Sequence, residues 1–132
     1  MRVAPASLKS HPETPDQHVR LRPALVNGAP LRLECPDWCS VDHVAADPFH
    51  LADVFHASDQ IALPAPAGRS TEDVLVAWLT EYPFVDGGGP VLALDAAGDE
   101  TAELSAGAAL AFADQLVAHA GALRQLAARV SA

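Results

Sequence analysis

The apolar positions of the chain alternate like strands through its middle and recur at helical spacing at its end. The clearest alternation covers residues 73–84, where Pro83 and several β-branched residues favour a strand over a helix. Both faces of this stretch are mainly apolar, so we expect a central strand that a helix covers on one side. Residues 106–130 keep one apolar face by steps of three or four, which predicts a long helix with Ser105 as its N-cap.

Weaker strand patterns surround the central one. Leu31–Leu33 alternates after an Asn27-Gly28 turn, residues 54–57 and 60–63 indicate one strand or two pieces of one, and residues 91–94 and 101–104 indicate two more. Pro64 and Pro66 are expected to end the strand before them. The pattern therefore predicts an α+β fold, a small mostly antiparallel β-sheet packed against one long C-terminal α-helix, with a Cys/His-rich loop.

The domain organisation follows from the same pattern. Residues 1–28 contain four prolines and no periodic apolar spacing, which predicts a flexible N-terminal arm. Residues 29–132 then form a single α+β domain, because a chain of 132 residues has room for one domain.

The composition excludes some classes of binding partner and favours one cellular compartment. Eight basic and 17 acidic residues give a net charge of −9, which argues against nucleic acid or an anionic membrane as a partner. We see no signal peptide and no apolar run near the roughly 18 residues of a membrane span, so we expect a cytoplasmic protein with reduced thiols. Only 5% of the residues are aromatic, which predicts a thin core of the kind that a structural metal often stabilises.

The segment 34–43 holds both cysteines of the chain in the pattern Cys35-x3-Cys39-x3-His43. If Cys35 capped a helical turn that begins at Pro36, these three side chains would share one face. Two thiolates and one imidazole on one face are typical metal ligands, and zinc is the metal that Cys/His clusters most often bind.

The fourth ligand of such a tetrahedral site would be His56 or His50. We prefer His56, because it adjoins a predicted strand that can fix its position, whereas His50 lies in a polar loop. Asp42 and Asp47 are candidates to accept a hydrogen bond from a ligand imidazole.

Three interpretations of this cluster stay open. A structural zinc site is favoured, because the chain contains no HExxH, GxSxG or zinc-deaminase pattern. A zinc-dependent hydrolase is the alternative, with Glu34 or Asp42 as the acid or base beside a bound water. In a metal-free domain, the two cysteines would be buried thiols packed around Trp38; a disulfide between them is disfavoured in a reducing cytosol.

The Cys35-Pro-x-Trp-Cys-x-x-Asp-His43 segment, the Phe55-His56 pair and the Ala- and Leu-rich closing helix together resemble a family of small proteins from filamentous high-GC bacteria. That family is known only as a domain of unknown function, so the resemblance implies a metal site without an activity. We therefore expect a small acidic interaction or regulatory module rather than an enzyme, with a structural zinc ion and either a protein partner or a second copy of itself.

Overall fold

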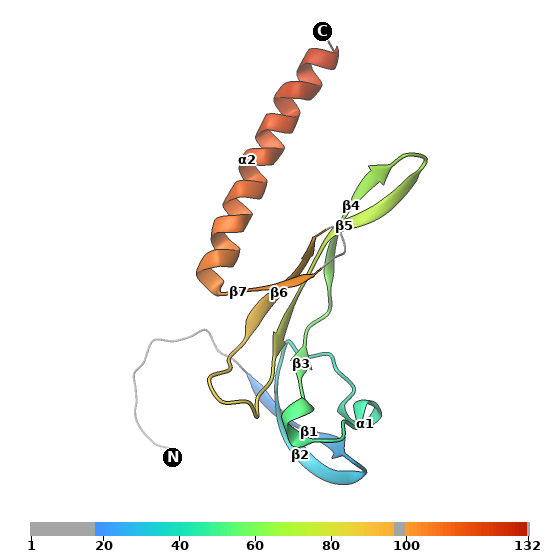
Figure 1. The fold of residues 1–132 in the computed structure, drawn as a ribbon, viewed down its shortest axis with the longest axis vertical. Helices are drawn as coiled ribbons and strands as arrows, with labels where there is room; N and C mark the ends of the chain where they lie inside the picture. The colour runs from blue at the N-terminus through green and yellow to red at the C-terminus, as the bar shows by residue number, and fades with distance from the viewer. Residues whose placement is uncertain (1–17, 97–99, 132) are drawn as a thin grey trace.

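The computed structural model describes residues 18–96 and 100–131. In chain order, its elements are β1 (Val19–Val26), β2 (Ala29–Pro36), α1 (His43–Ala46), the 3₁₀ turn η1 (Leu51–Asp53), β3 (His56–Ala57), β4 (Ile61–Ala67), β5 (Ser70–Glu81), β6 (Val91–Ala96), β7 (Thr101–Leu104) and α2 (Ala106–Ser131). Figure 1 shows the β1–β2 hairpin and α1 at one end of the molecule and the tip of α2 at the other. The predicted α+β class is confirmed.

All strand pairs are antiparallel, and they form two sheets. The first is the β1–β2 hairpin, and the second has five strands with β5 at its centre. Along one side β5 pairs with β3 and then with β4, and along the other side it pairs with β6, which in turn pairs with β7. The expectation that residues 73–84 form a central strand is therefore confirmed, although the strand runs from Ser70 to Glu81.

The β1–β2 hairpin corrects the predicted arm. The turn at Asn27 and Gly28 was expected, and both residues have positive φ, 48° and 79°, as a two-residue turn between right-twisted strands requires. Its first strand is Val19–Val26, which lies inside the stretch expected to be flexible. The alternation in β1 was obscured by Pro23, which a two-stranded hairpin tolerates because each strand keeps a free edge. Residues 1–17 of the predicted arm lie outside the described residues.

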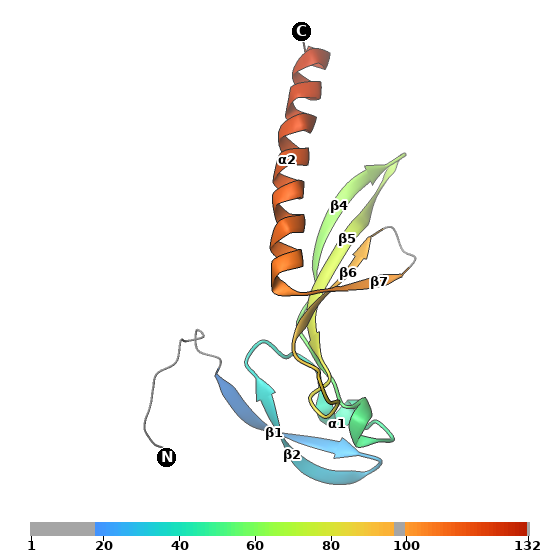
Figure 2. The same ribbon diagram turned by 60° about the vertical axis from the view of Figure 1, so that its left-hand side comes forward.

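The β4–β5 hairpin corrects a second expectation. Pro64 and Pro66 do not end the strand, because β4 continues to Ala67, with an irregularity in its register between Leu63 and Pro64. Both prolines are accommodated because β4 is an edge strand. Most residues in the outer part of this hairpin are exposed to solvent, and Figure 2 shows the hairpin extending past the rest of the sheet.

Helix α2 begins as predicted. The hydroxyl of Ser105 accepts a hydrogen bond from the Ala108 N–H at 3.2 Å, which satisfies one of the free donors of the first turn. The helix contacts β6 and β7, and among its described residues only Ala109 and Phe112, near its start, are partly buried. Figures 1 and 2 show the remainder of α2 continuing away from this contact.

The length and composition of α2 correct the expectation that no apolar run approaches a membrane span. The 25 residues Ala106–Val130 are long enough and apolar enough to cross a membrane, and none of them is buried. These two properties do not assign a location, since soluble helices can share them.

The hydrophobic core is small and lies between the β1–β2 hairpin and the segment that leads into β3. Ala24, Leu33 and Val54 are buried together, with Val26 and Leu31 packed against them. Among the described residues, nine are buried, and four of these are the cysteines and histidines Cys35, Cys39, His43 and His56. The Cys/His cluster is therefore a large part of the interior.

Candidate metal centre

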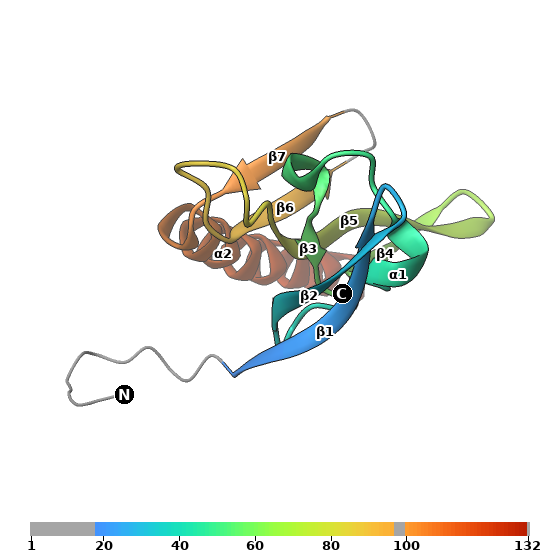
Figure 3. The same cartoon turned by 90° about the horizontal axis from the view of Figure 1, so that it is seen from below.

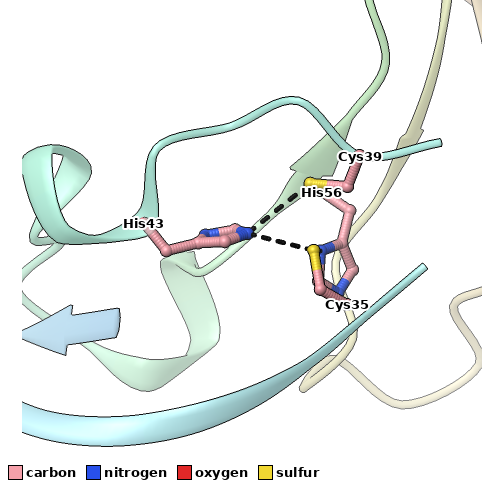
Figure 4. A group of neighbouring side chains, drawn as sticks. All are labelled: Cys35, Cys39, His43 and His56. Atoms are coloured by element: carbon pink, nitrogen blue, oxygen red, sulfur yellow. Dashed lines mark hydrogen bonds between the residues drawn. The ribbon is translucent and has the colours of Figure 1, made fainter. Parts of the chain in front are cut away.

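Four separate chain segments bring the predicted ligands together. Cys35 lies in β2, Cys39 in the loop that follows, His43 at the start of α1 and His56 at the start of β3. Figure 4 shows the two sulfur atoms beside the imidazole of His43, with the ring of His56 completing the group. The ligand atoms of all four residues lie within 4.8 Å of one another. The predicted convergence is therefore confirmed.

The way in which these residues converge differs from the prediction. Cys35 is a strand residue, so it does not cap a helical turn beginning at Pro36. The chain turns back after β2, where the Cys39 N–H donates to the Pro36 carbonyl at 3.1 Å, and α1 starts only at His43. A strand end and a tight turn thus replace the expected single helical face.

Two backbone bonds hold the loop in place. The Ser40 N–H donates to the Ala57 carbonyl at 2.9 Å and fixes the loop against β3, beside His56. At the other end of the loop, the Asp37 N–H donates to the His18 carbonyl at 2.9 Å, just before β1. The loop that carries Cys39 is therefore attached to both sheets. Figure 3 shows β1, β2 and β3 close together at this end of the molecule.

The distances fit a tetrahedral ion. His43 Nε2 lies 3.5 Å from Cys39 Sγ and 3.7 Å from Cys35 Sγ, and His56 Nδ1 lies 3.7 Å from Cys35 Sγ. Zn–S and Zn–N bonds of about 2.3 and 2.05 Å at tetrahedral angles place sulfur and nitrogen about 3.6 Å apart. Both cysteines are free thiols, not a disulfide. The four donors therefore form a Cys2His2 set of a size that suits zinc.

The cluster is enclosed. The exposed fraction is 0% for Cys35, 5% for Cys39, 5% for His43 and 2% for His56. The ring of Trp38 meets that of His56 edge to face, with centroids 6.3 Å apart, and the two histidine rings meet in the same manner at 5.4 Å. Surrounding side chains therefore cover the donors.

Burial also favours the neutral form of the two imidazoles. It lowers the pKa of His43, and the positive charge of Arg22 lowers it further. Burial likewise lowers the pKa of His56, assisted by His43 and Arg22 and opposed by a hydrogen bond with the Glu34 backbone. The lowered pKa of each histidine favours the neutral imidazole, which is the form that binds a metal.

The pKa of the Cys35 thiol shifts in the opposite direction. Burial is the main cause that raises its pKa, and the hydrogen bond with Cys39 adds to the rise, whereas the hydrogen bond from Arg22 lowers it. A buried pair of thiolates without a cation is costly, because both negative charges leave water. A divalent cation between the sulfurs would remove this cost.

Arg22 is the residue of this site that the sequence analysis missed. Its Nη1 donates to Cys35 Sγ at 3.5 Å and to the Cys39 carbonyl at 3.2 Å, and its Nη2 donates to the Val41 carbonyl at 3.2 Å. One guanidinium thus bonds a ligand atom and the loop that carries the other ligands. The signal that could have found it is the Arg20-Leu21-Arg22 alternation ahead of the Asn27-Gly28 turn.

The three other residues that the sequence suggested for the site make contacts elsewhere. His50 is exposed, stacks edge to face on Phe49 and is not a member of the cluster. Asp42 caps α1, since its Oδ1 accepts from the N–H groups of Val44 and Ala45 at 3.1 Å. Asp47 accepts from the Gly28 N–H at 2.8 Å and so fixes the β1–β2 turn. The hydrogen bonds found for both carboxylates thus go to the backbone rather than to a ligand imidazole.

Comparison with known proteins gives a family but no activity. A family model described as a domain of unknown function (DUF6907) matches residues 14–132. No curated protein and no solved structure gives a match. Membership of a family of unknown function, which the resemblance implied, is therefore confirmed.

Proposed function

The chain belongs to this DUF6907 family, and since the family has no assigned activity, we propose a role from the site itself: a small module held together by one structural zinc ion. Cys35, Cys39, His43 and His56 would be the four ligands. The observation that carries this proposal is the enclosure of a complete Cys2His2 donor set at tetrahedral spacing. A closed set of four protein ligands is typical of structural zinc, whereas catalytic zinc keeps one position open for water.

The position of the cluster supports a structural role. The ion would join β2 and the 37–43 loop to the first residue of β3, and so hold the β1–β2 hairpin against the five-stranded sheet. The apolar core at this junction is limited to Ala24, Leu33 and Val54 with two partly buried neighbours. A core of this size leaves a small domain dependent on a further cross-link, which metal binding supplies as folding free energy.

The zinc-dependent hydrolase is less well supported. It requires a coordination position open to water and an acid or base beside that water. The four donors are almost fully covered, and Asp42 is engaged as the cap of α1. Glu34 is exposed on β2 and lines the same groove as His56, but the other three ligands are not among the residues that line this groove. These observations favour a metal that stabilises the fold.

We propose that a protein partner binds in a groove beside the site. It has a volume of about 450 Å³ and is lined mainly by residues of β2 and of the segment after β5, with His56 among the lining residues. Its walls belong to the two sheets that the ion would join, so the metal would fix the width of the groove. Arg32, Glu34 and Glu81 give it charges of both signs, which suits a polypeptide better than a nucleic acid. We place this activity in the cytoplasm, where thiols stay reduced.

The metal content of the protein tests the proposal. We expect elemental mass spectrometry to find one zinc ion per chain in protein purified without added metal or chelator. Cys39→Ser and His56→Ala should lose the ion and unfold at a markedly lower temperature, while His50→Ala is the matched control that should keep both the ion and the stability of wild type.

Two outcomes would contradict a structural zinc. Absence of metal from freshly reduced wild type would favour the metal-free domain, in which the cysteines are only core residues. Zinc that binds without contributing to the thermal stability of the fold would favour the hydrolase.

A further inference from the structure

The exposed face of α2 has the spacing of a helix-pairing surface. From Phe112 to Val130, side chains that are apolar at all but one position recur alternately four and three residues apart. The positions of this seam are Phe112, Leu116, His119, Leu123, Leu126 and Val130, all apolar except His119. This is the a/d pattern of a seven-residue repeat, which keeps one stripe directed at a partner helix. The seam is distinct from the proposed metal centre.

The seam is covered at its base and bare toward its tip. Phe112 is partly buried where α2 meets the sheet, and Leu116 is 36% exposed. The exposed fraction then rises to 58% at Leu123, 62% at Leu126 and 85% at Val130. A 26-residue helix is about 39 Å long, so most of this apolar stripe lies beyond the reach of its own sheet. Figure 2 shows α2 standing clear of the sheet above β7.

The residues beside the seam suit close contact between helices. Ala113, Ala120 and Ala127 follow one another at seven-residue intervals along one flank of the seam. Side chains of this size allow two helix axes to approach closely. Asp114, Gln125 and Arg129 lie away from that flank, so the helix is amphipathic rather than apolar on every side. A partner helix therefore suits it better than the lipid interior.

We infer that α2 pairs with α2 of a second copy of this chain, in antiparallel orientation. Among the described residues, α2 is the only helix long enough to cover such a seam, and the seam is complementary to itself. In the antiparallel alignment, Leu116 meets Leu126 of the second copy and His119 meets Leu123, each contact being made twice.

Charge and dipole favour this orientation. The acidic residue of α2, Asp114, lies in its first half, and its two basic residues, Arg124 and Arg129, lie in its second half. Antiparallel pairing brings the acidic half of each helix beside the basic half of the other and opposes the two helix dipoles. Parallel pairing would instead place the four arginines of the dimer at one end.

Analytical ultracentrifugation of the full chain over a concentration series tests the pairing. We expect a species of twice the 13.8 kDa chain mass, and we expect Leu123→Glu to reduce it to a single chain without loss of bound zinc or secondary structure. Val117→Glu is the matched control, because Val117 lies outside the seam and is 73% exposed, and it should leave the dimer intact.

A pair of complementary variants tests the orientation. Leu116→Glu and Leu126→Lys should each weaken dimerisation alone, whereas a mixture of the two should form a mixed dimer, because antiparallel pairing places the two new charges opposite each other. In a parallel pair, each new charge would face leucine, and mixing would restore nothing.

Three results would overturn the inference. The first is wild type that remains a single chain at every concentration, and the second is a dimer that Leu123→Glu leaves unchanged. The third is single-chain wild type that floats with anionic phospholipid vesicles, which would show that lipid covers the seam.

Discussion

Arg22 Nη1 lies 3.5 Å from the sulfur atom of Cys35 and joins a strand of the β1–β2 hairpin to the Cys/His cluster. The same guanidinium donates hydrogen bonds to the carbonyl groups of Cys39 and Val41. It therefore holds the loop that leads from Cys35 to His43. A partner of this kind stabilises negative charge on the sulfur and fixes the orientation of the loop.

Replacement of Arg22 by methionine should weaken zinc binding. The variant keeps an apolar stem but loses three hydrogen bonds, and the loss of such partners typically lowers metal affinity by about 10- to 100-fold. Competition with a chromophoric chelator measures the change. Arg20→Met is the matched control, since Arg20 is an exposed residue of the same strand. Equal affinities of the two variants would show that Arg22 does not support the site.

The metal-free protein should lose stability as the pH falls. Burial lowers the pKa of His43 and His56 in the folded state below the ordinary value of 6.5, so the unfolded chain binds more protons. The stabilisation is therefore present above pH 6.5 and is lost as the pH falls through and below that value, by at most about 1.4 kcal/mol per pH unit for each histidine.

Urea unfolding of the chelated protein between pH 5 and 8 measures this slope. His56→Gln should reduce the slope, because the glutamine side chain does not titrate in this range. An unchanged slope in this variant would assign the acid sensitivity to other groups.

Substitution of Gly28 by alanine should destabilise the β1–β2 hairpin by about 1 kcal/mol. Gly28 has φ of +79°, and no neighbouring atom would meet an added Cβ within 4 Å, so the cost would come from the backbone conformation alone. Thermal unfolding compares it with Gly89→Ala, where the added Cβ also meets no neighbour and φ is not positive. If both variants were equally stable, the turn would not require glycine.

Removal of the Ser105 hydroxyl should destabilise the first turn of α2. Ser105→Ala leaves the Ala108 N–H without its side-chain acceptor, at a cost of about 1 kcal/mol. Amide hydrogen exchange should show faster exchange at 106–109 and little change in β5. Uniformly faster exchange along the chain would indicate that α2 unfolds together with the sheet.

The sequence was most informative where local chemistry decides the structure. The Asn27-Gly28 turn, the cap at Ser105 and the spacing of α2 depend on neighbouring residues, and all three were predicted correctly. The preference for His56 over His50 agrees with membership of the cluster, because a strand residue has a fixed position.

The wrong predictions concern residues whose structure depends on segments that are distant in the sequence. Pro23 and Pro64 indicated chain breaks, but strand pairing with a free edge overrides that preference. Cys35 and Cys39 share no helical face, because the pairing of β2 with β1 extends the backbone as far as Pro36. The contacts of Arg22 depend on the hairpin that brings it across to the loop, so the Arg20-Leu21-Arg22 alternation ahead of the turn indicates the strand but not these contacts.

The two prolines of β4 have a further consequence for how copies of this chain can associate. Pro64 and Pro66 are two residues apart in an edge strand, where proline is accommodated with its missing N–H on the side away from the neighbouring strand. A strand from another molecule would therefore find two missing donors in succession along this edge. The apolar residues Ile61 and Leu63 lie on the same strand, 72% and 50% exposed, and would otherwise make it a site for aggregation. The prolines thus protect the molecule against growth into open-ended sheets.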